Sequence, residues 1–275
     1  RRKPIGEVSQ MIFGSMPNDG GYFIFTEEEK DQFLKEEPKA SKYIKSLIGA
    51  EEFINNSKRY CLWLVGADPT EIKNMPKVLE RIEKVKKVRL GSKREATKKL
   101  AKTPSLFGEI RQPKENYLLV PFVSSENREI IPMGYFSIDF IATNRVAIVP
   151  GAGPYSFGIL TSTMHMVWVN RVCGRLKSDY NYSIGIVYNN FPWPRSVSDE
   201  QKKKVEEYAQ RVLDVRLQFP HSSLADLYDP NTMPSELVRV HNELDRAVDA
   251  CYGRKFSNKE ERIEFLFELY KEYIK

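Results

Sequence analysis

The run Phe191-Pro192-Trp193-Pro194 constrains this chain more than any other feature, because two prolines so close together end any regular element that reaches them. Beyond it, apolar residues recur with the period of an α-helix in residues 199–217, 234–252 and 258–273, each with a candidate cap. We therefore predict that residues 196–275 form a small all-helical C-terminal domain.

The first hundred residues are predicted to be irregular and then helical. Residues 1–24, rich in Gly, Pro, Asn and Ser, are typical of a connector from an upstream domain. Thr26 and Glu29 form a capping box that opens a helix, and Pro38 restarts a helical pattern that runs to residue 48. A longer helical stretch covers residues 70–90, and Pro76 should kink it or restart it.

The middle of the chain has the composition of a sheet. Residues 117–123, 130–141 and 145–149 are rich in β-branched and aromatic side chains and are separated by polar turns. A helix over residues 155–172 and a short strand over 184–188 follow. The predicted fold is α+β, in which N-terminal helices and a central, mostly antiparallel sheet make up a domain over residues 25–195, ahead of the helical one.

The charge of the chain is unevenly distributed. Residues 196–275 carry 13 basic and 16 acidic side chains, so the total of +6 leaves a net +9 on the part before them. Such an asymmetry favours a polyanionic partner for that part, although many basic domains bind no nucleic acid. Twelve basic residues follow the stretch from residue 70 onward. They form either a solvated helix face or a phosphate-contacting surface, and they are Lys73, Lys77, Arg81, Lys84, Lys86, Lys87, Arg89, Lys93, Arg94, Lys98, Lys99 and Lys102.

Cysteine usage and hydropathy indicate the cellular environment. The three cysteines, Cys61, Cys173 and Cys251, are far apart, which is typical of a reducing compartment and offers no zinc-binding cluster. The longest apolar runs are too short to cross a bilayer, and the chain shows no signal-peptide pattern. We expect a cytoplasmic protein that makes no membrane contact.

Two segments resemble catalytic or cofactor-binding motifs, but each lacks residues that the motif requires. Gly151 and Gly153 lie between a strand and a helix, but the third glycine and the acidic residue of a dinucleotide fingerprint are missing, so a plain turn is predicted. Asn190-Phe191-Pro192-Trp193 imitates the Asn-Pro-Pro-aromatic tetrad of amino-methyltransferases in the wrong register. We interpret it as a structural corner whose aromatic rings hold the C-terminal helices. His165 is predicted to be a packed side chain.

Several sequence runs, in order, resemble the C-terminal region of MmeI-like adenine-N6 DNA methyltransferases of type IIG/IIL restriction-modification systems. They are Glu52-Phe53-Ile54-Asn55-Asn56, Arg59-Tyr60-Cys61-Leu62-Trp63-Leu64, Ile110-Arg111-Gln112-Pro113, Ser162-Thr163-Met164-His165, Gly174-Arg175-Leu176-Lys177-Ser178-Asp179 and Tyr188-Asn189-Asn190-Phe191-Pro192-Trp193-Pro194. The resemblance implies a duplex-DNA target-recognition domain and a helical C-terminus. It places an S-adenosylmethionine-binding methyltransferase domain upstream in the same polypeptide, with Mg²⁺ required if a nuclease is fused as well. This segment alone is expected to hold no catalytic residue, cofactor or metal.

The resemblance also places base recognition after Gly-Arg-Leu. Lysine can donate to guanine O6 and N7, and aspartate can accept from cytosine N4, so Lys177 and Asp179, two apart on an extended loop, suit one G·C pair. Further predicted base readers are Asn181, Asn144, Arg145, Ser125 and Arg128. Predicted phosphate contacts are Arg59, Arg111 and Arg175, and the rival interpretation of these three arginines is a buried structural ion pair.

A protein-interaction or scaffold module with a basic face is the alternative function. DNA binding should weaken steeply with salt because each neutralised phosphate releases counterions, whereas an apolar protein interface should not. An enzyme active in its own right is disfavoured by the missing catalytic constellation.

Overall fold

The chain passes more than once between two folding units, so neither unit is a single stretch of sequence. In the computed structural model, which describes residues 1–275, unit 1 comprises Arg1–Ile12, Glu115–Tyr135 and Ala147–Lys275, and unit 2 comprises Phe13–Lys114 and Phe136–Val146. Each unit has its own buried apolar cluster. The two units cut across the sequence ranges predicted for the connector, the recognition domain and the helical domain, and that division stays a prediction.

Unit 2 combines several short helices with a small sheet. The helices are α1 (Glu27–Glu36), α2 (Ala50–Asn55), α3 (Pro69–Lys73), α4 (Pro76–Leu90) and α5 (Glu95–Lys99), with 3₁₀ turns η1 (Pro38–Tyr43) and η2 (Leu100–Lys102). The capping box of Thr26 and Glu29 is present. Pro76 ends one helix and begins the next, as predicted, because it supplies no N–H to the preceding turn.

The four-stranded sheet of unit 2 corrects one prediction. Its strands are β2 (Ile24–Phe25), β4 (Tyr60–Leu62), β3 (Ile44–Ile48) and β8 (Phe140–Ala142), in that order. Residues 38–48 were predicted to be helical, yet the pattern ends after one 3₁₀ segment and continues as β3. Strand β3 pairs antiparallel with β4 on one side and parallel with β8 on the other, so contacts distant in sequence override a locally helical pattern.

Unit 1 contains two sheets. The larger has the order β1 (Ile12–Phe13), β9 (Val146–Pro150), β5 (Tyr117–Pro121) and β7 (Gly134–Phe136), and β5 is buried along its whole length. The smaller is antiparallel and has the order β10 (Gly174–Leu176), β11 (Asp179–Asn181) and β6 (Val123–Ser124). The mixed fold with mostly antiparallel pairing is as predicted.

The helix predicted over residues 155–172 is two helices. Helix α6 (Pro154–Leu160) ends at Thr161, and α7 (Thr163–Val172) begins after Ser162, whose hydroxyl accepts from the His165 N–H at 3.4 Å. An N-cap serine offers the backbone this alternative to a continuous helix. The break is reinforced by Asp245, a residue distant in sequence, which accepts from the Thr163 N–H at 2.7 Å.

The strand predicted over residues 184–188 is absent. The segment folds into turns that end in the 3₁₀ turn η3 (Tyr188–Asn190), and the Val187 N–H donates to the Ser183 carbonyl within the segment at 2.8 Å. Its β-branched residues favour a strand, but no neighbouring strand pairs with it.

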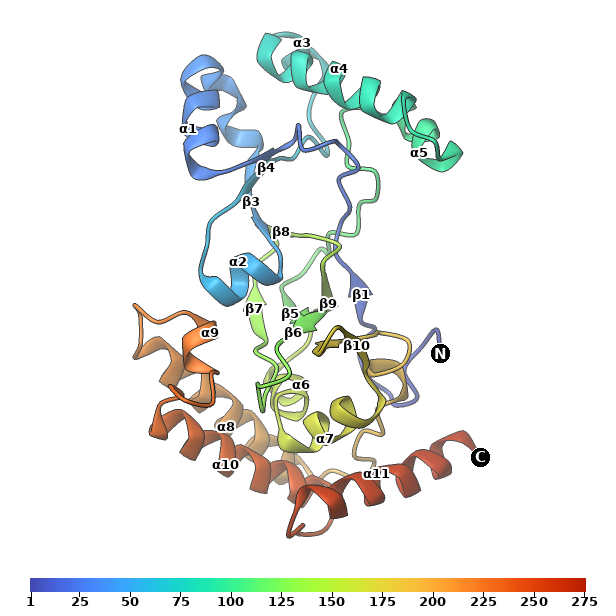
Figure 1. Ribbon diagram of the computed structural model, residues 1–275, viewed down its shortest axis with the longest axis vertical. Coiled ribbons are helices and arrows are strands. Elements are labelled where there is room, and N and C mark those ends of the chain that lie inside the picture. Colours follow the sequence, from blue (N-terminus) through green and yellow to red (C-terminus); the bar gives the residue numbers. More distant parts are fainter. The chain divides into compact units, whose positions relative to one another are not determined.

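The proline corner holds the C-terminal helices, as predicted. Phe191 and Trp193 are buried, the Tyr252 hydroxyl donates to the Pro192 carbonyl at 3.0 Å, and the Tyr273 hydroxyl donates to the Trp193 carbonyl at 2.9 Å. The helices are α8 (Asp199–Leu217), α9 (Leu224–Leu227), α10 (Ser235–Cys251) and α11 (Lys259–Ile274), seen around the lower part of Figure 1.

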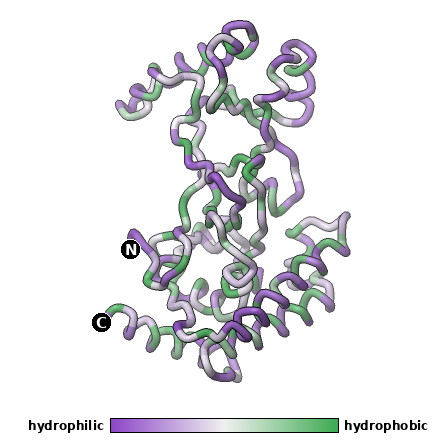
Figure 2. The backbone as a smooth tube through the Cα atoms, turned by 180° about the vertical axis from the view of Figure 1, so that it is seen from behind, coloured by the Kyte–Doolittle hydropathy of each residue, from purple (hydrophilic) through white to green (hydrophobic).

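The C-terminal helices share one core with the sheets of unit 1. Their tubes alternate between hydrophilic and hydrophobic residues in Figure 2, as amphipathic helices do. Gly158 of α6 lies against Val205 of α8, where an added Cβ would be 2.6 Å from the Val205 side chain. Leu118 of the sheet and Leu244 of α10 belong to the same buried cluster. The helices therefore support the sheet directly. No helix in the chain is both long and apolar enough to span a membrane.

Candidate nucleic-acid interface

A β-hairpin of unit 1 carries the residues predicted to read bases. Strands β10 and β11 pair with Leu176 opposite Asp179, which leaves Lys177 and Ser178 as a two-residue turn. Lys177, Ser178 and Asn181 are exposed, and Asp179 is partly buried. The predicted extended loop is therefore a tight hairpin, whose strand pairing sets the positions of Lys177 and Asp179 more narrowly than a loop would.

Lys177 lies in the left-handed region of backbone space, at φ 57°. Two-residue hairpins favour a positive φ at the first turn position because it matches the twist of the strands, and glycine usually supplies it. A lysine there costs about 1 kcal/mol in backbone strain. Strain of this kind, held by surrounding structure, is often found at functional sites.

Arg175 braces the hairpin from the strand that precedes the turn. It stands opposite Tyr180 in the strand register, and its guanidinium lies 4.0 Å from the centre of the Tyr180 ring. The same group donates to the Ser178 carbonyl at 3.2 Å and to Asn170 Oδ1 at 3.1 Å. The guanidinium thus joins the turn, the return strand and helix α7.

The loop after β6 meets the hairpin at Asp179. The Asp179 carboxylate accepts from the Glu126 N–H at 3.3 Å, and the Arg128 N–H donates to the Ser125 carbonyl at 3.2 Å in the adjoining turn. Burial lowers the pKa of Arg128, while Asp179 and Asp229 act in the opposite direction. Six predicted site residues therefore share one small sheet and its loops, namely Arg175 and five predicted base readers. These five are Lys177, Asp179, Asn181, Ser125 and Arg128.

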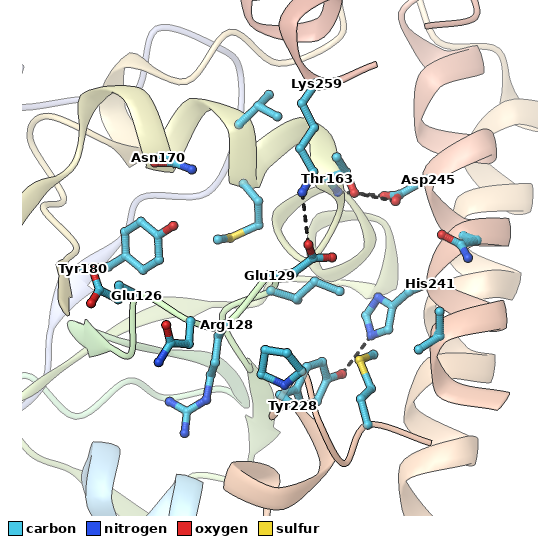
Figure 3. Close-up of a pocket in the computed structure, with 18 residues that line it drawn as sticks. Glu126, Arg128, Glu129, Thr163, Asn170, Tyr180, Tyr228, His241, Asp245 and Lys259 are labelled. Atoms are coloured by element: carbon cyan, nitrogen blue, oxygen red, sulfur yellow. Dashed lines mark hydrogen bonds and ion pairs between the residues drawn. The ribbon is translucent and has the colours of Figure 1, made fainter. Parts of the chain in front are cut away.

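A cavity of about 490 Å³ lies behind this loop, lined by the loop itself, α7, α10 and the chain before α10 (Figure 3). Asp245 on α10 also accepts from the Thr163 hydroxyl at 2.6 Å, and burial raises the pKa of Asp245 to about 6. Tyr228 and His241 are hydrogen-bonded at 2.9 Å, and burial lowers the pKa of His241 to about 3. Figure 3 shows the Arg128 side chain directed away from Asp245 and His241.

In unit 2 the predicted residues gather around the turn between β8 and β9. Thr143 is buried, the Asn144 N–H donates to the Ser15 carbonyl at 2.9 Å, and Arg145 is exposed. Gly14 leaves no room for a side chain, because an added Cβ would lie 2.2 Å from the Thr143 carbonyl oxygen. The close backbone approach at Gly14 fixes the turn and so the positions of Asn144 and Arg145.

Arg59 and Arg111 flank the same turn, and both are engaged. Arg59 forms an ion pair with buried Glu52 at 2.9 Å, and Glu52 also accepts from the Gly49 N–H at 2.8 Å. Arg111 pairs with Glu109 and donates to the Gly14 carbonyl at 3.0 Å. The side chains of Arg59 and Arg111 are 36% and 33% exposed, so each has a structural partner and still reaches solvent.

The apparent catalytic motifs have structural roles. Gly151, at φ 64°, and Gly153 form a plain turn from β9 into α6. The Asn190 amide donates to the Gly185 carbonyl at 2.8 Å. His165 is fully buried, its Nε2 lies 3.0 Å from the Tyr182 hydroxyl, and burial lowers its pKa to about 3. The predictions of a turn, a corner and a packed histidine are confirmed.

Three groups that hold the hairpin were not predicted from the sequence, namely Tyr180, Asn170 and the Glu126 N–H. Tyr180 carried a usable signal. Once residues 177–178 are taken as a two-residue turn, the aromatic ring falls opposite Arg175 by strand register alone. Asn170 and Glu126 reach the hairpin from other elements, and no local pattern predicts that.

Unit 1 presents an exposed charged hairpin and unit 2 a fixed polar turn, and polar side chains held on loops by a packed scaffold are the make-up of a recognition module. The chain belongs to the MmeI target recognition domain family. The family model described as "MmeI, target recognition domain" matches residues 1–195, and "MmeI, C-terminal domain" matches residues 197–275. The resemblance seen in the sequence is therefore confirmed.

Two relatives are similar over nearly the whole chain. DNA methyltransferase A of Bacillus subtilis (strain 168) is 44% identical over 273 residues, which is 99% of this chain and 31% of the relative. The structure of the type IIL restriction-modification enzyme MmeI in complex with DNA superposes with a TM-score of 0.97 at 47% identity, covering all of this chain and 37% of that one. The chain thus spans about a third of the length of these relatives.

Proposed function

We propose that this chain recognises a specific sequence in duplex DNA, as the target-recognition and C-terminal segment of a longer S-adenosylmethionine-dependent adenine-N6 methyltransferase of a restriction-modification system. The hairpin carries the proposal. A donor, Lys177, lies on a braced two-residue turn, and an acceptor, Asp179, lies two residues further on, at the start of β11. Lysine donates to guanine and aspartate accepts from cytosine in the major groove, so the two side chains suit the two halves of one G·C pair.

The remaining sites are assigned by their exposure and partners. Asn181, Ser125 and Arg128 are proposed to read bases beside the hairpin, and Asn144 and Arg145 to read bases from the turn in unit 2. Arg59 and Arg111 are proposed to contact phosphates, in competition with their ion pairs to Glu52 and Glu109. Arg175 is proposed to contact phosphate as well, and its three partners within the fold support an additional positioning role.

The chemistry belongs to the longer polypeptide in this proposal. A methyltransferase domain upstream would bind S-adenosylmethionine and modify an adenine taken out of the stack, while this segment holds the surrounding duplex. Where a nuclease domain is fused to it, DNA cleavage would need Mg²⁺. The helices α8–α11 hold the recognition sheet through their shared core.

The test compares two sequence motifs, each determined by sequencing the methylated sites in DNA. One is the motif of the full-length polypeptide, and the other is that of its Lys177→Glu, Asp179→Arg double variant. We expect the wild type to require guanine at one position and the variant to require cytosine there, since Glu accepts from cytosine and Arg donates to guanine on the other strand. One good bidentate contact discriminates by about 1–3 kcal/mol. An unchanged motif would refute the assignment.

The matched control exchanges an exposed pair elsewhere. Glu236 and Arg239 on α10 are 3.3 Å apart and both exposed, so Glu236→Arg with Arg239→Glu changes the same charges without touching the hairpin. The control should keep the wild-type motif. Binding of the isolated chain to a duplex, followed by fluorescence anisotropy at increasing salt, separates a DNA-binding segment from a scaffold for proteins, because phosphate contacts give a steep salt dependence.

A further inference from the structure

The second half of α4 and the segment after it form a strongly basic bend, residues 84–102, which we call the basic elbow. Within these residues Glu95 is the one acidic side chain, against nine lysines and arginines. Helix α5 and the turn η2 fold back against α4, as the upper part of Figure 1 shows. The basic side chains of both arms are therefore concentrated in one small region of unit 2.

Most of this charge is not neutralised within the fold. Lys84 pairs with Glu80 at 2.7 Å, and Lys98 pairs with Glu95 at 2.6 Å. The other exposed cations of the elbow form no ion pair with a carboxylate, and they are Lys86, Lys87, Lys93, Arg94, Lys99 and Lys102. Elsewhere on unit 2, lysines such as Lys42, Lys58 and Lys77 each have an acidic partner. Isolated lysines such as Lys39 and Lys73 also lack an acidic partner, so the elbow differs from the remaining surface of unit 2 by the close spacing of its unpaired cations.

Arg89 holds the elbow closed and corrects the sequence-based view of it as a surface cation. Its side chain is fully buried and donates five hydrogen bonds to backbone carbonyls, which use every N–H of the guanidinium. The acceptors are Leu100 and Thr103 at 3.0 Å, Pro17 at 3.0 Å, Leu106 at 2.7 Å and Asn18 at 2.9 Å. Burial lowers the pKa of Arg89, and the nearby Asp19 carboxylate acts against that change.

The fold of the elbow therefore carries two electrostatic costs. It removes one cation from water without a salt-bridge partner, and by doing so it keeps two lysine-rich arms together although like charges repel. A bound polyanion would relieve that repulsion, and its phosphates would be neutralised by flexible ammonium groups that require no fixed geometry.

We propose that the basic elbow is a second DNA-binding surface, which contacts the phosphate backbone of a duplex without reading its sequence. The choice of DNA as the polyanion rests on the proposed function of the chain. The residues involved are separate from those of the hairpin and of the turn at Asn144, so the elbow adds affinity while the motif is set elsewhere.

The test compares two quadruple variants of the full-length polypeptide on a duplex that lacks the recognition sequence. The first is Lys86→Gln, Lys87→Gln, Lys93→Gln, Lys99→Gln. The matched control is Lys202→Gln, Lys203→Gln, Lys204→Gln, Lys255→Gln, which removes three exposed lysines from α8 and one from the loop between α10 and α11. The dissociation constant is measured by anisotropy between low and moderate salt, and the methylated motif is determined for each protein.

We expect the log–log salt slope of the elbow variant to fall by about 0.9 for each phosphate that is no longer neutralised, which is about 3–4 for four phosphates. Its motif should remain that of the wild type, and the control should keep both slope and motif. An elbow variant whose slope equals that of the control would overturn the proposal. A wild type that binds duplex through the elbow but shows no motif would refute the proposed function and not the elbow.

Discussion

The hairpin of unit 1 and the basic elbow of unit 2 are both exposed and charged, yet they are built on opposite principles. The hairpin places a few side chains by strand register, a strained turn and a stacked arginine. The elbow presents many interchangeable lysines and keeps them together with one buried arginine. Discrimination between bases needs fixed geometry, whereas attraction to a phosphate backbone needs only charge density.

The largest expected effect is a loss of stability when Arg89, at the centre of the elbow, is replaced. Arg89→Met leaves the carbonyls that Arg89 now satisfies without donors, so we expect unit 2 to lose about 4 kcal/mol of stability. Denaturant unfolding measures it, together with hydrogen exchange over residues 84–106. The exposed Arg94→Met should stay within about 0.5 kcal/mol of the wild type. Equal stability of the two variants would show that Arg89 is not the clamp.

The next largest effect concerns two buried charged side chains, Asp245 in unit 1 and Arg89 in unit 2. Their contributions to stability should respond differently to pH. Burial raises the pKa of Asp245, behind the hairpin, to about 6. A raised carboxyl pKa means that its contribution to stability is fully present below about pH 4 and is lost as pH rises through 6. The loss is about 2–3 kcal/mol. Arg89 stays charged throughout this range, so the elbow should not respond.

Asp245→Asn tests this difference, because the amide can still accept from the Thr163 N–H and donate to its hydroxyl. The wild type should lose stability relative to the variant between about pH 4 and 6, measured by denaturant unfolding at each pH. Parallel curves for the two proteins would contradict the prediction. Hydrogen exchange should locate the pH-dependent change in α7 and α10, with the elbow unchanged.

A smaller effect is expected at Lys177, where one substitution should change both the backbone strain of the hairpin and the proposed contact with guanine. Lys177→Gly relieves the left-handed backbone at that position, so we expect the folded chain to gain about 1 kcal/mol. The same change removes the proposed guanine donor and leaves Asp179 as the acceptor for cytosine, so the full-length polypeptide should methylate its sites with a weakened preference for guanine at that position. Thermal unfolding and motif sequencing together measure both effects. A glycine variant whose preference for guanine equalled that of the wild type would exclude Lys177 as the reader.

The smallest effect is expected at Arg175, where substitution distinguishes a side chain that positions the hairpin from one that contacts a phosphate. If it positions the hairpin, Arg175→Met should weaken base discrimination by about 1 kcal/mol, the worth of the stacking and hydrogen bonds, and leave the salt slope unchanged. If it mainly contacts phosphate, the slope should fall by about 0.9 and the motif should hold. Arg175→Lys keeps the charge but not the planar stack, so it rescues only the phosphate role.

Much of the local structure was predictable because its causes are local. The capping box at Thr26, the restart at Pro76 and the helices after the proline corner depend on neighbours within a few residues, and all three are present. The proposed base readers Lys177 and Asp179 were also accessible, through a family resemblance carried by their sequence context. The failures were β3 over residues 44–48, the break at Ser162 and the missing strand at 184–188. In each, partners distant in sequence, or their absence, decided the outcome.

The class of fold and most of the helices followed from the sequence, because period, caps and prolines act through neighbouring residues. The family and the segment that carries the hairpin followed from the resemblance of several sequence runs. The tertiary structure was needed to show that Arg89 is buried, that Arg175 reaches Asn170 of α7, and that the C-terminal helices share a core with the sheet. A charged side chain has the same local signature whether it faces water or a ring of carbonyls. Its role is set by which backbone folds around it.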